Sequence, residues 1–170
     1  MMISVSLSAQ LEVTHLFVKG FSAFGAGSVL HAGFPIVGPD EIGVETGLYF
    51  FGANGHNAAV VPCLLSYRHT LDGSGTGYYL EPFGGYSFAG TDIQKTDSSG
   101  NPLYTANFQQ IDQKMNGVTV GLAFGYIIAS HSFPVNIGVR YGHTFVAGDP
   151  STNMFSIRIC YSSVAAKASR

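Results

Sequence analysis

Histidine and cysteine are the residues of this 170-residue chain best suited to metal binding or catalysis. A metal site needs several ligands that converge, and in sequence these ligands often form closely spaced pairs. No two of the histidines are spaced in that way, and Cys63 and Cys160 fall in well-separated segments. The histidines are His15, His31, His56, His69, His131 and His143. We therefore predict no metal site, no cofactor, no catalytic residue and no disulfide.

Five isolated charged residues form a second candidate site, because each is surrounded by small or apolar residues. They are Glu45, Arg68, Glu81, Arg140 and Arg158. If their segments share an interior, the low dielectric makes unpaired charge costly and favours pairing. We predict that at least one Glu and two Arg of this set lie within ion-pair distance, as a structural ion-pair network. The alternative is that the same groups form a proton or ion path.

The segments that carry these five charges have the two-residue period of β-strands. The segment from Phe133 to Val146 is the clearest: large apolar side chains alternate with small or polar ones, among them Arg140. No segment has sustained helical spacing, which indicates an all-β chain. The other alternating segments are 42–51, 59–68, 78–88, 118–128 and 155–161.

The composition of the polar face indicates which face meets solvent. It consists mostly of Gly, Ala, Ser, Thr and Asn with one charge per strand, whereas a solvated face usually carries several Lys and Glu. In a membrane barrel the bulky residues face lipid and the small or charged residues face the lumen. A Lys or Arg that faces lipid near the bilayer midplane costs about 2–4 kcal/mol, so the five charges belong in the lumen.

The overall composition agrees with a membrane barrel. Apolar residues make up 46% of the chain and charged residues 11%, with 22 Gly. A typical soluble domain has roughly 25% charged residues. The balance of 8 Lys and Arg against 10 Asp and Glu argues against nucleic-acid binding through a basic face. No apolar run approaches the ~18 residues of a membrane helix, so strands must do the spanning.

Turn residues separate the alternating segments and set their order. Short turns are expected at 37–41, 53–56, 72–75, 130–131 and 148–151. The one long connection runs from Gly90 to Asp112, and membrane barrels place such loops outside the cell. Residues 11–36 must supply two further strands, with a turn near Gly20 to Gly27. We predict a single antiparallel up-and-down transmembrane β-barrel of eight strands, filled by its own side chains and not an open pore.

Three segments resemble small outer-membrane β-barrel proteins of the OmpA/OmpX-like type found in Bacteroidota. Val61 to Arg68 and Gly77 to Tyr86 resemble their paired central strands, and Asn136 to Tyr141 resembles their penultimate strand. The resemblance covers Gln10 to Tyr161 through loose strand patterns. It implies location in the bacterial outer membrane and recognition of a terminal aromatic residue by the outer-membrane assembly machinery. Tyr161 fits that recognition, although nine residues follow it.

The domain organisation follows from the same reading. Residues 1–9 end in a small-residue pattern, Ser6 to Ala9, and are predicted to be the remnant of a signal peptide. An ordinary first strand is the alternative. Residues 10–161 are the β-barrel domain, and residues 162–170 are a C-terminal tail.

The predicted function is a non-catalytic outer-membrane barrel with a structural or surface-interaction role. Its expected partners are membrane lipids and the assembly machinery, with no nucleic acid, an unidentified external partner and a monomeric state. One alternative is a soluble lipocalin-like ligand-binding barrel with an apolar cavity. The less favoured alternative is a lipid A-modifying enzyme, which needs a His, a Ser and an acid on the outer face. His131 and Ser132 are adjacent, but they fall at a turn without an acid partner.

Overall fold

The computed structural model contains eight β-strands in the part of the chain that it describes. They are β1 (Ser6–Val18), β2 (Phe21–Pro35), β3 (Glu41–Ala53), β4 (His56–Thr70), β5 (Gly77–Thr91), β6 (Gly117–Ile128), β7 (Val135–Val146) and β8 (Thr152–Ser163). The described residues are 5–36, 38, 40–73, 75–97, 99, 101–128 and 134–163. No helix among these residues has the length and apolar character needed to span a membrane.

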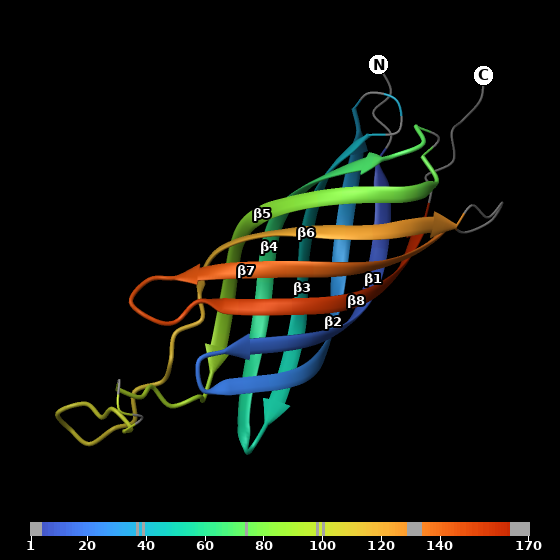
Figure 1. Ribbon diagram of the computed structural model, residues 1–170. Helices are drawn as coiled ribbons and strands as arrows, with labels where there is room; N and C mark the ends of the chain where they lie inside the picture. The colour runs from blue at the N-terminus through green and yellow to red at the C-terminus, as the bar shows by residue number, and fades with distance from the viewer. Residues whose placement is uncertain are drawn as a thin grey trace.

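The strands form one closed barrel in which every strand is antiparallel to the next (Figure 1). β1 pairs with β8 as well as with β2, from Leu7 opposite Ser163 to Phe17 opposite Asn153. Closure satisfies the backbone groups of the first and last strands, so no described strand has a free edge. The predicted eight-stranded, all-β, up-and-down barrel is confirmed.

The two ends of the barrel differ. β1 begins and β8 ends at one end, here called the terminal end. Four connections lie at the opposite end, here called the loop end, and one of them is the long β5–β6 loop, residues 92–116 (Figure 1). The shortest connections at this end are Lys19-Gly20, between β1 and β2, and Asn54-Gly55, between β3 and β4.

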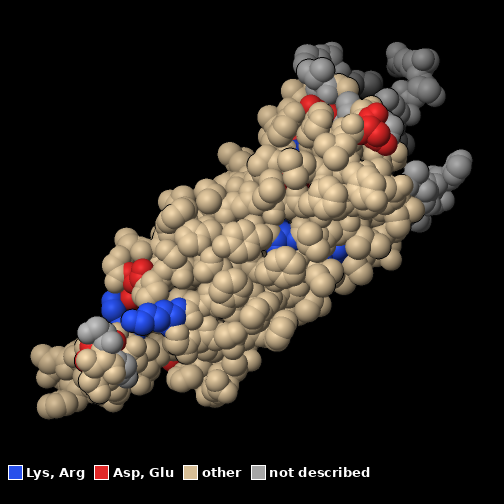
Figure 2. Space-filling view, viewed as in Figure 1, with Lys and Arg blue, Asp and Glu red and all other residues tan. Residues whose placement is uncertain are grey.

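Large apolar side chains cover the outside of the barrel. Along β7, Ile137, Val139 and Tyr141 are 42–45% exposed, whereas the intervening Arg140 is buried. Figure 2 shows charged atoms gathered toward the two ends of the molecule and a broad band between them with little charge. The strands are 12 to 15 residues long, more than the roughly 9–11 residues that cross a bilayer. This arrangement is that of a membrane barrel, and it contradicts a lipocalin-like barrel whose apolar faces line a cavity.

The first hairpin turns at Lys19 and Gly20, at the start of the predicted range 20–27. Gly20 has a φ of +82°, which suits glycine in a tight turn. Gly25 and Gly27 lie within β2 and are not part of the turn. A Cβ at Gly27 would lie 2.2 Å from Cδ1 of Tyr49. Glycine is therefore required here because an aromatic ring of β3 packs over the β2 backbone.

Three other predicted boundaries shift. β1 begins at Ser6, so Ser6 to Ala9, predicted as the end of a signal peptide, belong to the first strand. Their alternation explains this, since Leu7 is 60% exposed and Ser8 is buried. β8 extends to Ser163, two residues past the predicted domain end, and residues 164–170 of the predicted tail lie outside the described part. The long loop covers residues 92–116 instead of 90–112.

Candidate functional site

The structure brings all five predicted charged residues together in the barrel lumen. Glu81 Oε2 lies 2.5 Å from Arg68 Nε, and Glu81 Oε1 lies 2.8 Å from Arg158 Nη2. Glu45 Oε2 lies 2.7 Å from Arg140 Nη2, and Glu45 Oε1 lies 3.7 Å from Arg158 Nη1. The exposed fraction of these five side chains is 13% for Arg68 and 6% or less for the other four. Each carboxylate thus lies between two guanidinium groups.

Two further carboxylates extend this chain of ion pairs at its ends. Glu12 lies 3.4 Å from Arg140, and Glu41 lies 3.5 Å from Arg68. His31, which is 2% exposed, lies 3.7 Å from Glu41. We call the five predicted residues together with Glu12 and Glu41 the lumenal network. It joins β1, β3, β4, β5, β7 and β8 across the interior.

The alternation of residues in the sequence is sufficient to predict that Glu12 points into the lumen. It is not sufficient to predict this for Glu41. Glu12 alternates with Leu11 and Val13, which are 68% and 63% exposed. The same parity argument that placed Arg140 inside therefore applies to it. Glu41 stands at the end of a predicted turn, where the parity of the following strand is not yet defined. Its inward position depends on β3 starting at Glu41.

Polar and aromatic groups make further contacts with the buried arginines. Arg158, 0% exposed, donates to Gln10 Oε1 at 3.3 Å and to the Tyr79 hydroxyl at 3.1 Å. The guanidinium carbon of Arg140 lies 3.9 Å from the centroid of the Phe83 ring. Arginine is well suited to such sites because its planar guanidinium group forms ion pairs in its plane and contacts aromatic rings with its faces.

The half of the lumen toward the loop end contains an apolar core beside a few buried hydroxyl groups, among them those of Ser87, Thr119 and Thr144. Its buried core comprises Leu16, Val18, Phe21, Ala23, Val29, Tyr49, Phe51, Ala58, Val60, Ile93 and Met115. Ile93 and Met115 belong to the β5–β6 loop and are 5% and 2% exposed. The loop therefore closes the barrel at this end. Tyr49 and Phe51, which are 2% and 3% exposed, point into this core from β3.

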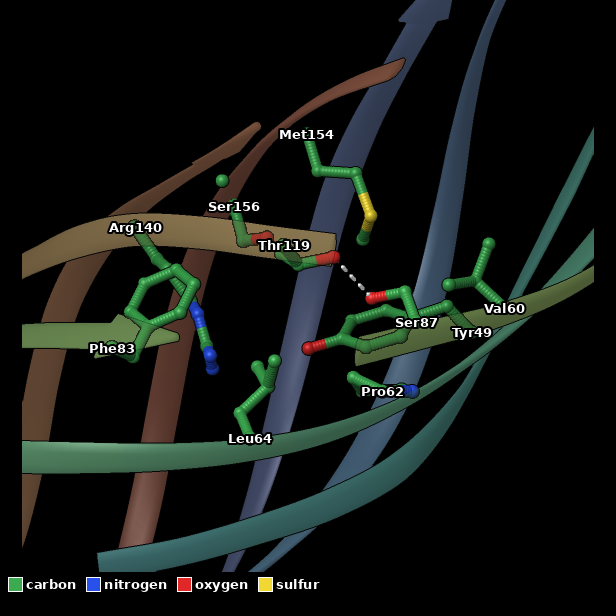
Figure 3. A pocket seen from close by; sticks show the side chains of 11 residues that line it. Tyr49, Val60, Pro62, Leu64, Phe83, Ser87, Thr119, Arg140, Met154 and Ser156 are labelled. Carbon is green, nitrogen blue, oxygen red and sulfur yellow. Dashed lines mark hydrogen bonds between the residues drawn. The ribbon is translucent and has the colours of Figure 1, made fainter. Parts of the chain in front are cut away.

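A small cavity lies between the lumenal network and the apolar core (Figure 3). Its volume is 30 Å³, enough for about two water molecules at roughly 10–15 Å³ each. Ser87 and Thr119 form a 2.7 Å hydrogen bond at its wall, and the Phe83 ring lies against Arg140. This space is far below the roughly 300–1,000 Å³ of a typical ligand pocket. At this level of the barrel, side chains of the wall therefore fill most of the lumen.

The histidines described by the structure have separate surroundings. His15 lies 2.8 Å from the Ser22 hydroxyl, and His143 lies 2.8 Å from Asn153 Oδ1. His56 and His69 contact Asp92 and Asp40 near opposite ends of the barrel. His131 and Ser132 lie outside the described residues. Among the described residues no group of three or more His, Cys, Asp or Glu is arranged to hold a metal ion. Cys63 is exposed on the outer wall and Cys160 is buried, so they lie on opposite faces.

The His15–Ser22 pair bears on the enzyme alternative. Both side chains face outward near the loop end, and His15 stacks on Phe24 with ring centroids 4.5 Å apart. A serine nucleophile with a histidine base usually has a third group that orients the histidine. Within the described part of the chain, no carboxylate is hydrogen-bonded or ion-paired to His15. The outer wall thus holds two of the three groups that a hydrolase needs.

Contacts with Asn57 and Asp149 help to hold the β5–β6 loop at its base. The backbone N–H of Asn57 donates to Asp92 Oδ1 at 2.6 Å, and Lys95 Nζ lies 2.7 Å from Asp149 Oδ1. The hydrogen bonds from Asn57 hold the pKa of Asp92 below its ordinary value. Beyond these contacts the loop forms two small turns, with bridges between Thr96 and Pro102 and between Tyr104 and Gln110. Phe108, 90% exposed, stands at the tip of the second turn.

Comparison with solved structures identifies the fold. Neisserial surface protein A (NspA) is 15% identical, with a TM-score of 0.73 over 96% of this chain and 99% of that one. Ail, the attachment invasion locus protein of Yersinia pestis, is 9% identical, with a TM-score of 0.63 over 96% and 100%. The N-terminal β-barrel domain of Pseudomonas aeruginosa OprF is 12% identical, with a TM-score of 0.56 over 92% and 97%. No family model matches the sequence, and no curated protein matches it.

At these identities the likeness concerns the fold. The chain has the architecture of small bacterial outer-membrane β-barrels, as the resemblance of its central and penultimate strands implied. The exposed apolar wall and the buried charges support the same conclusion from physical chemistry.

Proposed function

We propose that the protein is a non-catalytic anchor in the bacterial outer membrane, with a structural or surface-interaction role. The observation that carries this proposal is the contrast between a filled lumen and an elaborated loop end. The lumenal network and the apolar core occupy the interior, which argues against an open pore. The chain outside the barrel wall is concentrated in the β5–β6 loop, where binding residues are commonly found.

The proposed partners follow from the outer surface. Lipid acyl chains cover the exposed apolar wall, and the outer-membrane assembly machinery reads the outward-facing residues near the end of β8. Ile157, Ile159 and Tyr161 form an exposed apolar row on that strand. The closed sheet offers no free strand edge for pairing with another copy, which favours a monomer.

Membrane orientation provides the first test. In a variant without Cys63 and Cys160, we introduce Phe108→Cys at the loop end or Leu71→Cys at the terminal end. Both positions are exposed. A membrane-impermeant maleimide should label Phe108→Cys on intact cells and should label Leu71→Cys only after lysis. Labelling of Leu71→Cys alone on intact cells would reverse the orientation. Recovery of folded protein without detergent would contradict the membrane location.

Loop replacement tests the role itself. Replacing residues 95–111 with a four-residue turn removes the exposed part of the β5–β6 loop and retains Ile93 and Met115 in the core. The barrel should fold as before, judged by heat-dependent migration in gels, while surface properties of the cell such as attachment change. A purely structural role predicts no change in any surface property.

A lipid-modifying enzyme is the second candidate, favoured only by the His15–Ser22 hydrogen bond. Hydrolysis of an ester lipid by the refolded protein in vesicles, lost in both Ser22→Ala and His15→Gln, would establish it. Ser28→Ala, at an exposed serine further along β2, is the matched control. We expect the three variants and the parent to be equally inactive.

A further inference from the structure

A cleft at the loop end lies between three connections of the barrel. It is lined by Lys19 of the β1–β2 turn, by Lys95, Thr96, Asp97 and Gln113 of the β5–β6 loop, and by Gly148, Asp149 and Pro150 of the β7–β8 turn. We call it the loop cleft. Its volume is 390 Å³, within the roughly 300–1,000 Å³ of small-molecule sites. It is also more than ten times larger than the lumenal cavity of 30 Å³.

Both carboxylates that line the loop cleft already have partners within the protein. Asp149, only 3% exposed, pairs with Lys95, and Lys95 also donates to the Gly148 carbonyl at 3.2 Å. Asp97 Oδ1 accepts from the backbone N–H groups of Ser99 and Asn101 at 2.8 and 2.9 Å. These contacts hold the β5–β6 loop against the β7–β8 turn and shape the cleft wall. A cationic ligand would have to compete with these existing partners.

The donors of the loop cleft are not engaged to the same extent. Lys19 is exposed and forms no ion pair or hydrogen bond with any residue that the structure describes. Gln113 is 6% exposed, and its side-chain Nε2 is buried without a hydrogen-bond partner among the described residues. A buried donor without a partner is unfavourable, and such groups in folded proteins call for an explanation. A ligand that brings acceptor oxygens and a negative charge matches this surplus of donors.

We propose that the loop cleft binds an acidic sugar, meaning a hydroxyl-rich ring that carries a carboxylate or a phosphate. The anionic group pairs with Lys19, and ring hydroxyls contact Thr96, Gln113 and the cleft wall at Pro150. The volume suits one or two sugar rings. This inference adds a ligand to the proposed surface-interaction role. It rests on that role only for the position of the cleft on the outside of the cell.

Calorimetric titration of the full-length protein, refolded in detergent, tests binding independently of orientation. The probes are glucuronic acid, glucose 6-phosphate, uncharged glucose and inorganic phosphate. Both acidic sugars should bind, and glucose should bind much more weakly. Equal affinity for inorganic phosphate and glucose 6-phosphate would overturn the sugar part of the proposal. No binding of either acidic sugar would overturn it entirely.

Lysine variants locate the site. Lys19→Gln should weaken binding of both acidic sugars by about tenfold or more, because it removes a charge-assisted contact. Lys114→Gln is the matched control, since Lys114 is an exposed lysine of the same loop that does not line the cleft. An equal effect of the two variants, or none from Lys19→Gln, would contradict the assignment. Heat-dependent migration verifies that each variant folds.

The length of the sugar probe distinguishes a natural ligand that is a polymer from one that is a free sugar acid. If the natural ligand is a polymer, tri-galacturonic acid should bind at least as tightly as galacturonic acid. If it is a free sugar acid, the trimer should bind more weakly. Failure of the orientation test with normal sugar binding would refute the outer-surface role and leave the cleft assignment intact, whereas the reverse result would refute the cleft alone.

Discussion

Arg158 and Glu81 lie 77 positions apart in the sequence, yet Arg158 Nη2 and Glu81 Oε1 are 2.8 Å apart across the lumen. Both side chains are 0% exposed. The pair joins β8 to β5, two strands that are not neighbours in the barrel. The lumenal network therefore ties opposite walls together, which hydrogen bonds between adjacent strands do not achieve.

Removing one partner of this pair should destabilise the barrel strongly. Glu81→Gln leaves Arg68 and Arg158 without their shared carboxylate, and breaking a buried ion pair costs about 3–5 kcal/mol. We expect a loss of this size in the free energy of unfolding by urea from lipid vesicles. Arg158→Met combined with Glu81→Gln should cost less than the two single changes added together, because the residues interact. Additive effects would show that the pair is not coupled.

Unfolding by urea from lipid vesicles also tests whether the outer wall of the barrel faces lipid. Val139→Arg places a charge on the middle of β7 facing lipid, and the expected loss is about 2–4 kcal/mol. Ile128→Arg, at the end of β6, lies near the membrane boundary, where the expected loss is about 0–1 kcal/mol. Val139 and Ile128 are 42% and 44% exposed, so they differ in depth and not in exposure. Equal, small effects would contradict a lipid-covered wall.

The contact between Asp92 and Asn57 should depend on pH. Hydrogen bonds from Asn57 lower the pKa of Asp92, so the carboxylate contributes stability above its unfolded pKa of about 3.9. That contribution is lost as the pH falls through the lower pKa of the folded state. The NMR resonance of the Asn57 amide should therefore titrate below about pH 3.9, and Asp92→Asn should abolish the titration. A midpoint at or above that value would contradict the contact.

Strand periodicity was sufficient to predict the wall of the barrel but not which residues meet across its lumen. The alternation around Arg140 placed that residue inside because each neighbour was bulky and apolar. The partners of Arg140, Glu45 on β3 and Glu12 on β1, depend on which strands face each other across the lumen. That relationship is set by the closed pairing of β1 with β8, which local sequence does not contain.

The contacts of the β5–β6 loop with the barrel core were even harder to predict from the sequence. Ile93 and Met115 resemble ordinary apolar loop residues, and nothing near them in the chain indicates burial. Their position depends on an apolar core within the lumen that residues of other strands form, such as Leu16 and Tyr49. The loop cleft likewise combines three connections that are far apart in the sequence. Long-range packing of this kind has no local pattern.

The role of Ile93 and Met115 leads to a prediction about loop mobility. Both side chains are buried in the apolar core, and truncating such residues to alanine costs about 2–5 kcal/mol. Because they belong to a loop and not to the wall, this cost should appear as detachment of the β5–β6 loop. Ile93→Ala and Met115→Ala should therefore speed proteolytic cleavage within residues 92–116 while heat-dependent migration stays unchanged.

Tyr104→Ala is the matched control for this experiment, because Tyr104 belongs to the same loop but is 54% exposed. Its removal should leave the cleavage rate near that of the parent protein. If Met115→Ala and Tyr104→Ala accelerate cleavage equally, anchoring by the core does not hold the loop. If Met115→Ala prevents folding altogether, Met115 stabilises the barrel wall itself. The expected difference between the two variants thus separates a docked loop from one that is merely connected to β5 and β6.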